Sequence, residues 1–130
     1  MAAFSDYLEN KLLDHTLGTG AYTAPGTVYI ALYTAAPSDA GGGTEAAWTS
    51  YARQSAAFSA ASGGTTSNSA EITFPAVDTG DGPITITHMG IFDAATSGNL
   101  LYHGALAASK TLQDDDVVKF NAGDIDVTLA

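Results

Sequence analysis

The sequence predicts a mainly β protein, an antiparallel β-sandwich of jelly-roll type with one N-terminal α-helix. Apolar residues recur every three to four positions only near the start of the chain, and after Pro25-Gly26 they alternate with a period of two. Short apolar runs separated by turn-forming segments are typical of sandwiches and jelly rolls. At 130 residues the chain has room for one domain. We expect that domain to comprise a helix with its cap in residues 1–20 and the sandwich in residues 26–130.

The helix is predicted from a stripe of Phe4, Leu8 and Leu12, which recur at four-residue steps. Ser5 or Asp6 can cap its first turn, and two glycines shortly after the stripe can end it. A helix of about four turns is marginal alone in water. We therefore expect the stripe to pack on the sandwich or on a neighbouring subunit, and Phe4, Leu8 and Leu12 are candidate assembly residues.

Residues 28–33 are predicted to form a central strand, because apolar side chains occupy both of its faces. Tyr29 and Tyr33 lie on the second face, where they are candidates for a subunit contact. Further strands are expected at residues 51–58, 70–74, 84–92 with a bulge at Gly90, 100–106, 117–120 and 124–129, with Ile125, Val127 and Leu129 pointing inward. Loops are expected at residues 37–47, 60–68 and 93–99.

Composition and charge exclude several classes of function. Ala, Thr, Ser and Gly are abundant, whereas charged residues make up only 14% of the chain, so its surface costs little to desolvate in an assembly contact. The net charge of −10 disfavours binding to nucleic acid or to an anionic membrane. The sequence contains no apolar run long enough for membrane insertion. We expect oligomeric assembly instead.

An enzymatic function is not predicted, and no catalytic residue is assigned. The sequence contains no G-x-S-x-G motif and no cysteine, and it has only three histidines, which we expect to be structural. His103 has no obvious acidic partner in the pattern. The N-terminus also lacks the basic start and apolar stretch of a signal peptide, so we expect the chain to be made in the cytoplasm.

Acidic residues near the C-terminus offer weak candidates for a metal site. Oxygen ligands of this kind suit Ca²⁺, but the spacing of an EF-hand is absent, so no cofactor is assigned and solvated acidic turns are favoured. The candidates are Asp114, Asp115, Asp116, Asp124 and Asp126.

Trp48 lies among Gly, Ala and Thr residues, so we expect it on an exposed loop and include it among the candidate assembly residues. Exposed aromatic side chains can also stack on sugars. A carbohydrate- or receptor-binding module is therefore the alternative function, with loops 37–49 and 60–69 as possible carriers of the aromatic residues. They are Trp48, Tyr51, Tyr22, Tyr29, Tyr33 and Tyr102.

Two segments carry a resemblance to a known family. The N-terminal stretch with LENKLLDH and the unit ITHMGIFDAATSGNLLYHGAL resemble small virion proteins of tailed phages that are described as tail-fibre proteins. The resemblance implies a β-rich structural protein of the phage virion, on the tail, the fibre or the capsid surface as a decoration protein. It also implies synthesis in the host cytoplasm, several copies, which we expect to form a trimer, and contacts with other virion proteins.

Overall fold

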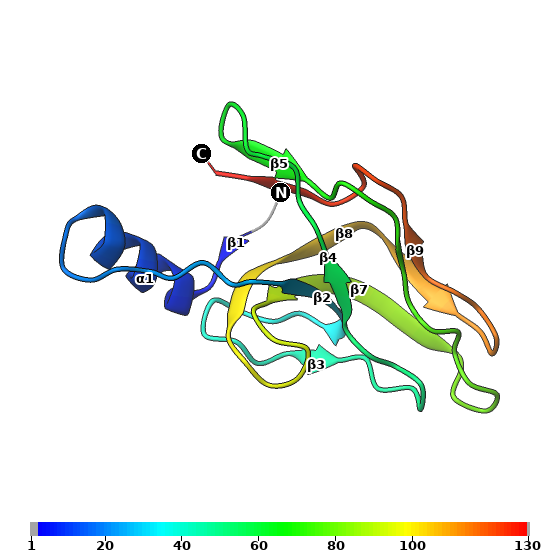
Figure 1. Ribbon diagram of the computed structural model, residues 1–130. Helices are drawn as coiled ribbons and strands as arrows, with labels where there is room; N and C mark the ends of the chain where they lie inside the picture. Colours follow the sequence, from blue (N-terminus) through cyan, green and yellow to red (C-terminus); the bar gives the residue numbers. More distant parts are fainter. Residues whose placement is uncertain (1–2, 130) are drawn as a thin grey trace.

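The computed structural model describes residues 3–129, and within them the chain forms ten β-strands and one α-helix (Figure 1). All strand pairs are antiparallel, so the prediction of a mainly β fold with one N-terminal helix is confirmed. The elements are β1 (Ala3–Phe4), α1 (Asp6–Thr16), β2 (Val28–Ala35), β3 (Thr44–Glu45), β4 (Gln54–Ala56), β5 (Thr65–Ser67), β6 (Ile72–Thr73), β7 (Ile84–Phe92), β8 (Leu100–Leu112), β9 (Lys119–Phe120) and β10 (Asp126–Thr128).

The larger layer is a sheet with the strand order β1-β8-β7-β2-β3. Strand β4 pairs with the first part of β2, and β3 pairs with its second part, so both share one edge of β2. The opposite layer consists of two two-stranded ribbons, β5–β10 and β6–β9. Both ribbons pair segments that are far apart in sequence.

The main core lies between the large sheet and the two ribbons. Ile30 and Leu32 of β2 and Ile86 of β7 are fully buried there, facing side chains that come from the ribbons and their loops. The residues of this core are Ile30, Leu32, Ala46, Trp48, Ile72, Phe74, Val77, Ile86, Ile91, Leu112, Val118, Phe120, Ile125 and Val127. The inward positions predicted for Ile125 and Val127 are confirmed, whereas Leu129 is exposed and that part of the prediction is wrong.

The second face of β2 is also buried, as its apolar pattern predicts. Ala31 and Tyr33 form a smaller cluster there with Phe92 and Leu100. The bulge expected at Gly90 is not at that residue, because the register shifts fall on either side of it, at 86/88 and 91/92. A Cβ at Gly90 would lie 2.9 Å from the Leu100 side chain and 3.1 Å from the Tyr33 ring, so glycine is required for packing.

Local chemistry explains where α1 begins. Ser5 is the N-cap, and its Oγ accepts a hydrogen bond from the Leu8 N–H. The same hydroxyl donates to the carbonyl of Leu100, which ties the cap to β8. Phe4 belongs to β1 and not to the helix, because its backbone pairs with Tyr102 of β8. The expectation that Phe4 starts the helical stripe is therefore wrong.

Several strand boundaries differ from the prediction. Strands β3 and β5 lie inside the segments 37–47 and 60–68, which the sequence pattern assigns to loops. These segments are rich in Gly, Ser and Thr, so they show no alternation of apolar residues that would indicate a strand. Strand β8 continues to Leu112 because β7 provides a partner along that length. The hairpin loop at 93–99 is confirmed, and Asp93 accepts hydrogen bonds from the backbone and side chain of Asn99.

Within residues 3–129, no helix has the length and apolar character needed to cross a membrane.

Candidate assembly surfaces

The helix α1 projects from one end of the sandwich as an arm (Figure 1). Its inner side packs on β8 through Leu8, which is almost fully buried. Glu9, Leu13 and Leu17 follow one another at four-residue steps, so they lie along a single face. Leu13 is 57% exposed and Leu17 is 73% exposed, the highest values among the large apolar residues described by the structure. We call Glu9, Leu13 and Leu17, the C-cap residue directly after α1, together with Asp14 beside them, the outer face of α1.

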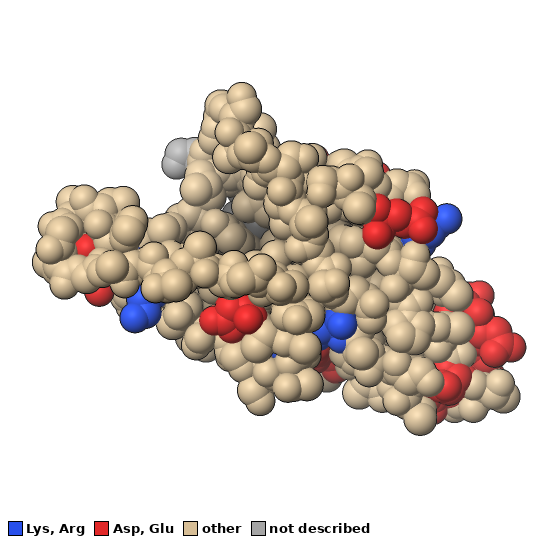
Figure 2. Space-filling model, viewed as in Figure 1, with Lys and Arg blue, Asp and Glu red and all other residues tan. Residues whose placement is uncertain are grey.

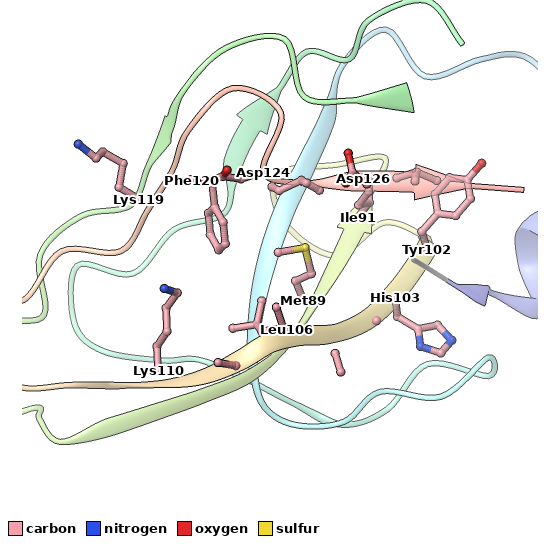
Figure 3. Close-up of a pocket in the computed structure, with 16 residues that line it drawn as sticks. Met89, Ile91, Tyr102, His103, Leu106, Lys110, Lys119, Phe120, Asp124 and Asp126 are labelled. Atoms are coloured by element: carbon pink, nitrogen blue, oxygen red, sulfur yellow. The ribbon is translucent and has the colours of Figure 1, made fainter. Parts of the chain in front are cut away.

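A groove with a volume of about 530 Å³ runs between β8 and the strands β9 and β10 (Figure 3). Met89 and Leu106 lie on its large-sheet side, and Phe120 points into it from β9. The wall on β8 is low, because Gly104, Ala105 and the following alanines carry short side chains or none. We call this feature the β8–β10 groove.

The outer edge of β8 beside the groove has free pairing capacity. Strand β1 pairs with β8 only at Tyr102 and His103. In the part of the chain that the structure describes, residues 105–111 of β8 have no strand partner on that edge. An unpaired strand edge beside an apolar groove is a surface that another chain can cover.

Charge is distributed unevenly over the surface. Two of the four basic residues, Lys110 and Lys119, line the β8–β10 groove, and Figure 3 places both at the same end of it. Lys119 lies 3.7 Å from Glu71 in an exposed ion pair. Acidic side chains gather at the end of the molecule farthest from α1, where the loops around residues 78–82 and 113–116 lie (Figure 2).

The five acidic candidates for a metal site do not converge. Both carboxylate oxygens of Asp114 accept backbone N–H groups, from Gly80 and Gly82. Asp116 and Asp124 each accept a backbone N–H group within their own turn. In residues 3–129 there is no group of three or more His or acidic side chains arranged to hold a metal ion. Asp114, Asp116 and Asp124 therefore stabilise loops, and nothing in their arrangement favours Ca²⁺ over this role.

Three of the predicted assembly residues are buried inside the protomer. The expectation that Trp48 is exposed is wrong, since it is only 3% exposed and packs edge-to-face on Tyr51 in the main core. The prediction was wrong because it relied on the loop-like composition around Trp48, whereas the side chain is buried in the main core. Leu8 and Tyr33 are also covered by their own chain.

The remaining predicted assembly residues are partly buried. Phe4 packs edge-to-face on Tyr102, with ring centroids 5.3 Å apart. Tyr29 pairs with Phe92 of β7 and Ser55 of β4, and Leu12 lies at the side of α1. Tyr29 lies on β2, which makes no contact with α1 among the described residues, so Tyr29 and the helix residues do not form one continuous surface.

The sequence pattern does not predict an ion pair between Arg53 and Glu45, which lies beside Phe92 of β7. Arg53, the only arginine of the chain, forms two 2.9 Å hydrogen bonds to the carboxylate of Glu45. Its guanidinium also donates to two carbonyls of loop 93–99 and stacks 3.6 Å from the centroid of Phe92. Tyr51 donates to the same carboxylate, at 2.7 Å. In the sequence, the only indication of this network is that Glu45, Tyr51 and Arg53 lie within nine residues of one another, between the end of β3 and the start of β4.

Electrostatics in the Arg53 network favour the charged pair. Burial acts to lower the pKa of Arg53, but hydrogen bonding to Glu45, the charge of its carboxylate and the nearby tyrosines together outweigh burial, and the pKa is raised above its ordinary value. Burial raises the pKa of Tyr51 strongly, so its hydroxyl stays protonated as a donor. The network lines a second cavity of about 590 Å³, next to the start of α1.

His103 also has a partner that the sequence pattern does not reveal. Its Nε2 lies 2.7 Å from the carboxylate of Asp39, which is 64 residues away along the chain. The expectation that His103 faces no acid is therefore wrong. This contact ties loop 38–43 to β8 beside the start of α1, because the Asp39 carbonyl also accepts the Asp6 N–H.

Comparison with known proteins gives one finding. Residues 3–128 match the model of the family Gp80, described as podophage GP4 fiber I protein gp80. A search of curated proteins found no match.

Proposed function

The chain belongs to the Gp80 family of phage fibre proteins and is thus a structural component of the virion, and on that premise we propose that it works by self-assembly through α1. The observation that carries the proposal is the outer face of α1, where Leu13 and Leu17 stand in solvent while Leu8 holds the helix to β8.

The two sides of α1 support different roles. A short helix needs tertiary contacts to be stable, and Leu8 and the Ser5 cap supply them. The outer leucines make no comparable contribution to the protomer, because most of their surface stays in water. Covering them in an assembly contact removes that apolar surface from water. The arm is therefore preformed, which lowers the entropy cost of association.

The trimer and the non-enzymatic role remain part of this proposal. A closed ring protects free strand edges such as that of β8. The proposed position in the virion is the fibre or a neighbouring surface. Nucleic acid is not a proposed partner, because the four basic residues are separated in sequence and the net charge is −10.

A carbohydrate-binding function has weaker support. Trp48, Tyr33 and Tyr51 are three of its candidate platforms, and all of them pack within the protomer. They are therefore not available as flat surfaces for a sugar.

The test compares two sets of variants by light scattering after size-exclusion chromatography. We expect the natural chain to have about three times the protomer mass of 13.2 kDa. Replacing both outer leucines, as Leu13→Asp with Leu17→Asp, should give the protomer mass. Val117→Asp is the matched control, because Val117 is a similarly exposed apolar residue outside α1. A natural chain that is monomeric at micromolar concentration and across a wide range of salt would overturn the proposal.

A further inference from the structure

We infer that the β8–β10 groove is the acceptor for the outer face of α1 from a second copy of this chain. The inference rests on the proposed self-assembly, and it names the surface to which the arm binds. The apolar and charged features of the groove and of the helix face complement each other.

The apolar features match in kind. The groove presents Met89, Leu106 and Phe120 around its floor, and α1 presents two exposed leucines one helical turn apart. Because the β8 wall consists largely of alanines, a helix can approach the strand closely. Contact between the two surfaces removes both apolar patches from water at once.

The charges select this pairing over others. Two protomers of net charge −10 repel each other, so a contact between them is favoured where a basic surface meets an acidic one. Lys110 and Lys119 give the groove a basic end, whereas Glu9 and Asp14 accompany the leucines on α1. Lys110 forms no ion pair within residues 3–129 and so is available to a second copy.

The groove also has an acidic end. Asp126 and His103 lie toward the end opposite the two lysines (Figure 3). The orientation that avoids repulsion places Glu9, near the N-terminal end of α1, over the lysines. Leu13 and Leu17, which follow Glu9 at four-residue steps, then lie along the apolar middle of the groove.

The geometry favours a ring. The donor surface and the acceptor surface are different parts of the chain, so each copy can give its helix to one neighbour and accept the helix of another. The groove, the free edge of β8 and the arm are all present in one protomer. Repeating one such contact closes into a cyclic oligomer if the rotation between copies allows it.

A charge-swap experiment tests the inference. One variant carries Lys110→Glu and Lys119→Glu in the groove, and the other carries Glu9→Lys and Asp14→Lys on the helix. We expect each variant alone to associate roughly tenfold more weakly than the natural chain in sedimentation experiments at low salt. Mixing the two variants should restore association, because every groove then finds a helix of opposite charge. Ser55→Glu is the control, since Ser55 is exposed on β4 and belongs neither to α1 nor to the β8–β10 groove.

Cross-linking provides a second measurement that does not depend on charge. The chain has no cysteine, so Leu13→Cys in one protein and Ala107→Cys in another form the only available thiols. We expect a disulfide-linked dimer on mild oxidation of the mixture, and much less with Ser55→Cys on β4 in place of the groove cysteine. If the natural chain is oligomeric but swap and cross-link both fail, the groove assignment is wrong and the proposed function stands. A monomeric natural chain would overturn both.

Discussion

Removing the guanidinium of Arg53 should destabilise the protein more than any other single change to a charged residue. The variant Arg53→Met keeps most of the side-chain volume but deletes four hydrogen bonds, two to Glu45 and two to carbonyls of loop 93–99. It also leaves the Glu45 carboxylate without its counter-charge. Arg53 is 10% exposed and Glu45 is 27% exposed, so solvent compensates only in part.

The expected cost follows from this geometry. Breaking a buried ion pair by removing one partner costs about 3 to 5 kcal/mol, and the partial exposure of Glu45 favours the lower end of that range. A loss of about 3 kcal/mol lowers the Tm of a domain of this size by roughly 10 °C. A total stability of about 5 to 15 kcal/mol leaves the variant folded.

The assay is urea unfolding followed by the fluorescence of Trp48, the single tryptophan, which is buried in the main core. The double variant Arg53→Met with Glu45→Gln is the control, because it removes the unpaired carboxylate together with the guanidinium. We expect it to be more stable than Arg53→Met alone by about 1 kcal/mol. A loss below about 1 kcal/mol for Arg53→Met, or no recovery in the double variant, would show that this ion pair does not stabilise the protein.

Three further predictions concern the anchor, the acidic loops and calcium. Leu8→Ala should cost about 2 to 5 kcal/mol of unfolding free energy because the site is buried, and an unchanged urea midpoint would show that α1 is a loose appendage. Hydrogen bonds from the Thr49 N–H and hydroxyl lower the pKa of Asp81. The contribution of Asp81 to stability is therefore fully present above the ordinary Asp pKa of about 4, and it is lost as the pH falls through the lowered pKa. Asp81→Asn should therefore weaken the fall of Tm in acid, and a fall as steep as that of the natural chain would contradict this. Millimolar calcium or EDTA should leave the Tm unchanged, and a clear rise with calcium would revive the site at the C-terminal aspartates.

Much of the fold is predictable because its strongest signals are local. The alternation of apolar residues in β2 identifies a strand covered on both faces, and the chemistry of Ser5 and Asp93 marks a helix cap and a hairpin loop. These features depend on residues only a few positions apart. The sequence pattern therefore places the helix, the central strand and the β7–β8 hairpin correctly.

The features that escape prediction depend on partners far apart in sequence. Strand β5 is visible only through its pairing with β10, about sixty residues later. The buried Asn68 looks like a loop residue, yet it donates to two carbonyls and accepts the Ile125 N–H, which joins β5 to the last turn. The same is true of the site. The stripe with Leu8 and Leu12 can be recognised in the sequence, but the exposed leucines Leu13 and Leu17 are not among the predicted assembly residues. The groove exists only because β8, β9 and β10 meet in space.

Cryo-electron microscopy of the intact virion is the most direct test of the proposed assembly, because it shows location, copy number and contacts together. We expect several copies of the chain on a fibre, related by rotational symmetry, with Leu13 and Leu17 of each copy in the β8–β10 groove of the next. Isolated copies whose α1 outer face lies in solvent, or a ring in which that groove stays empty, would contradict it.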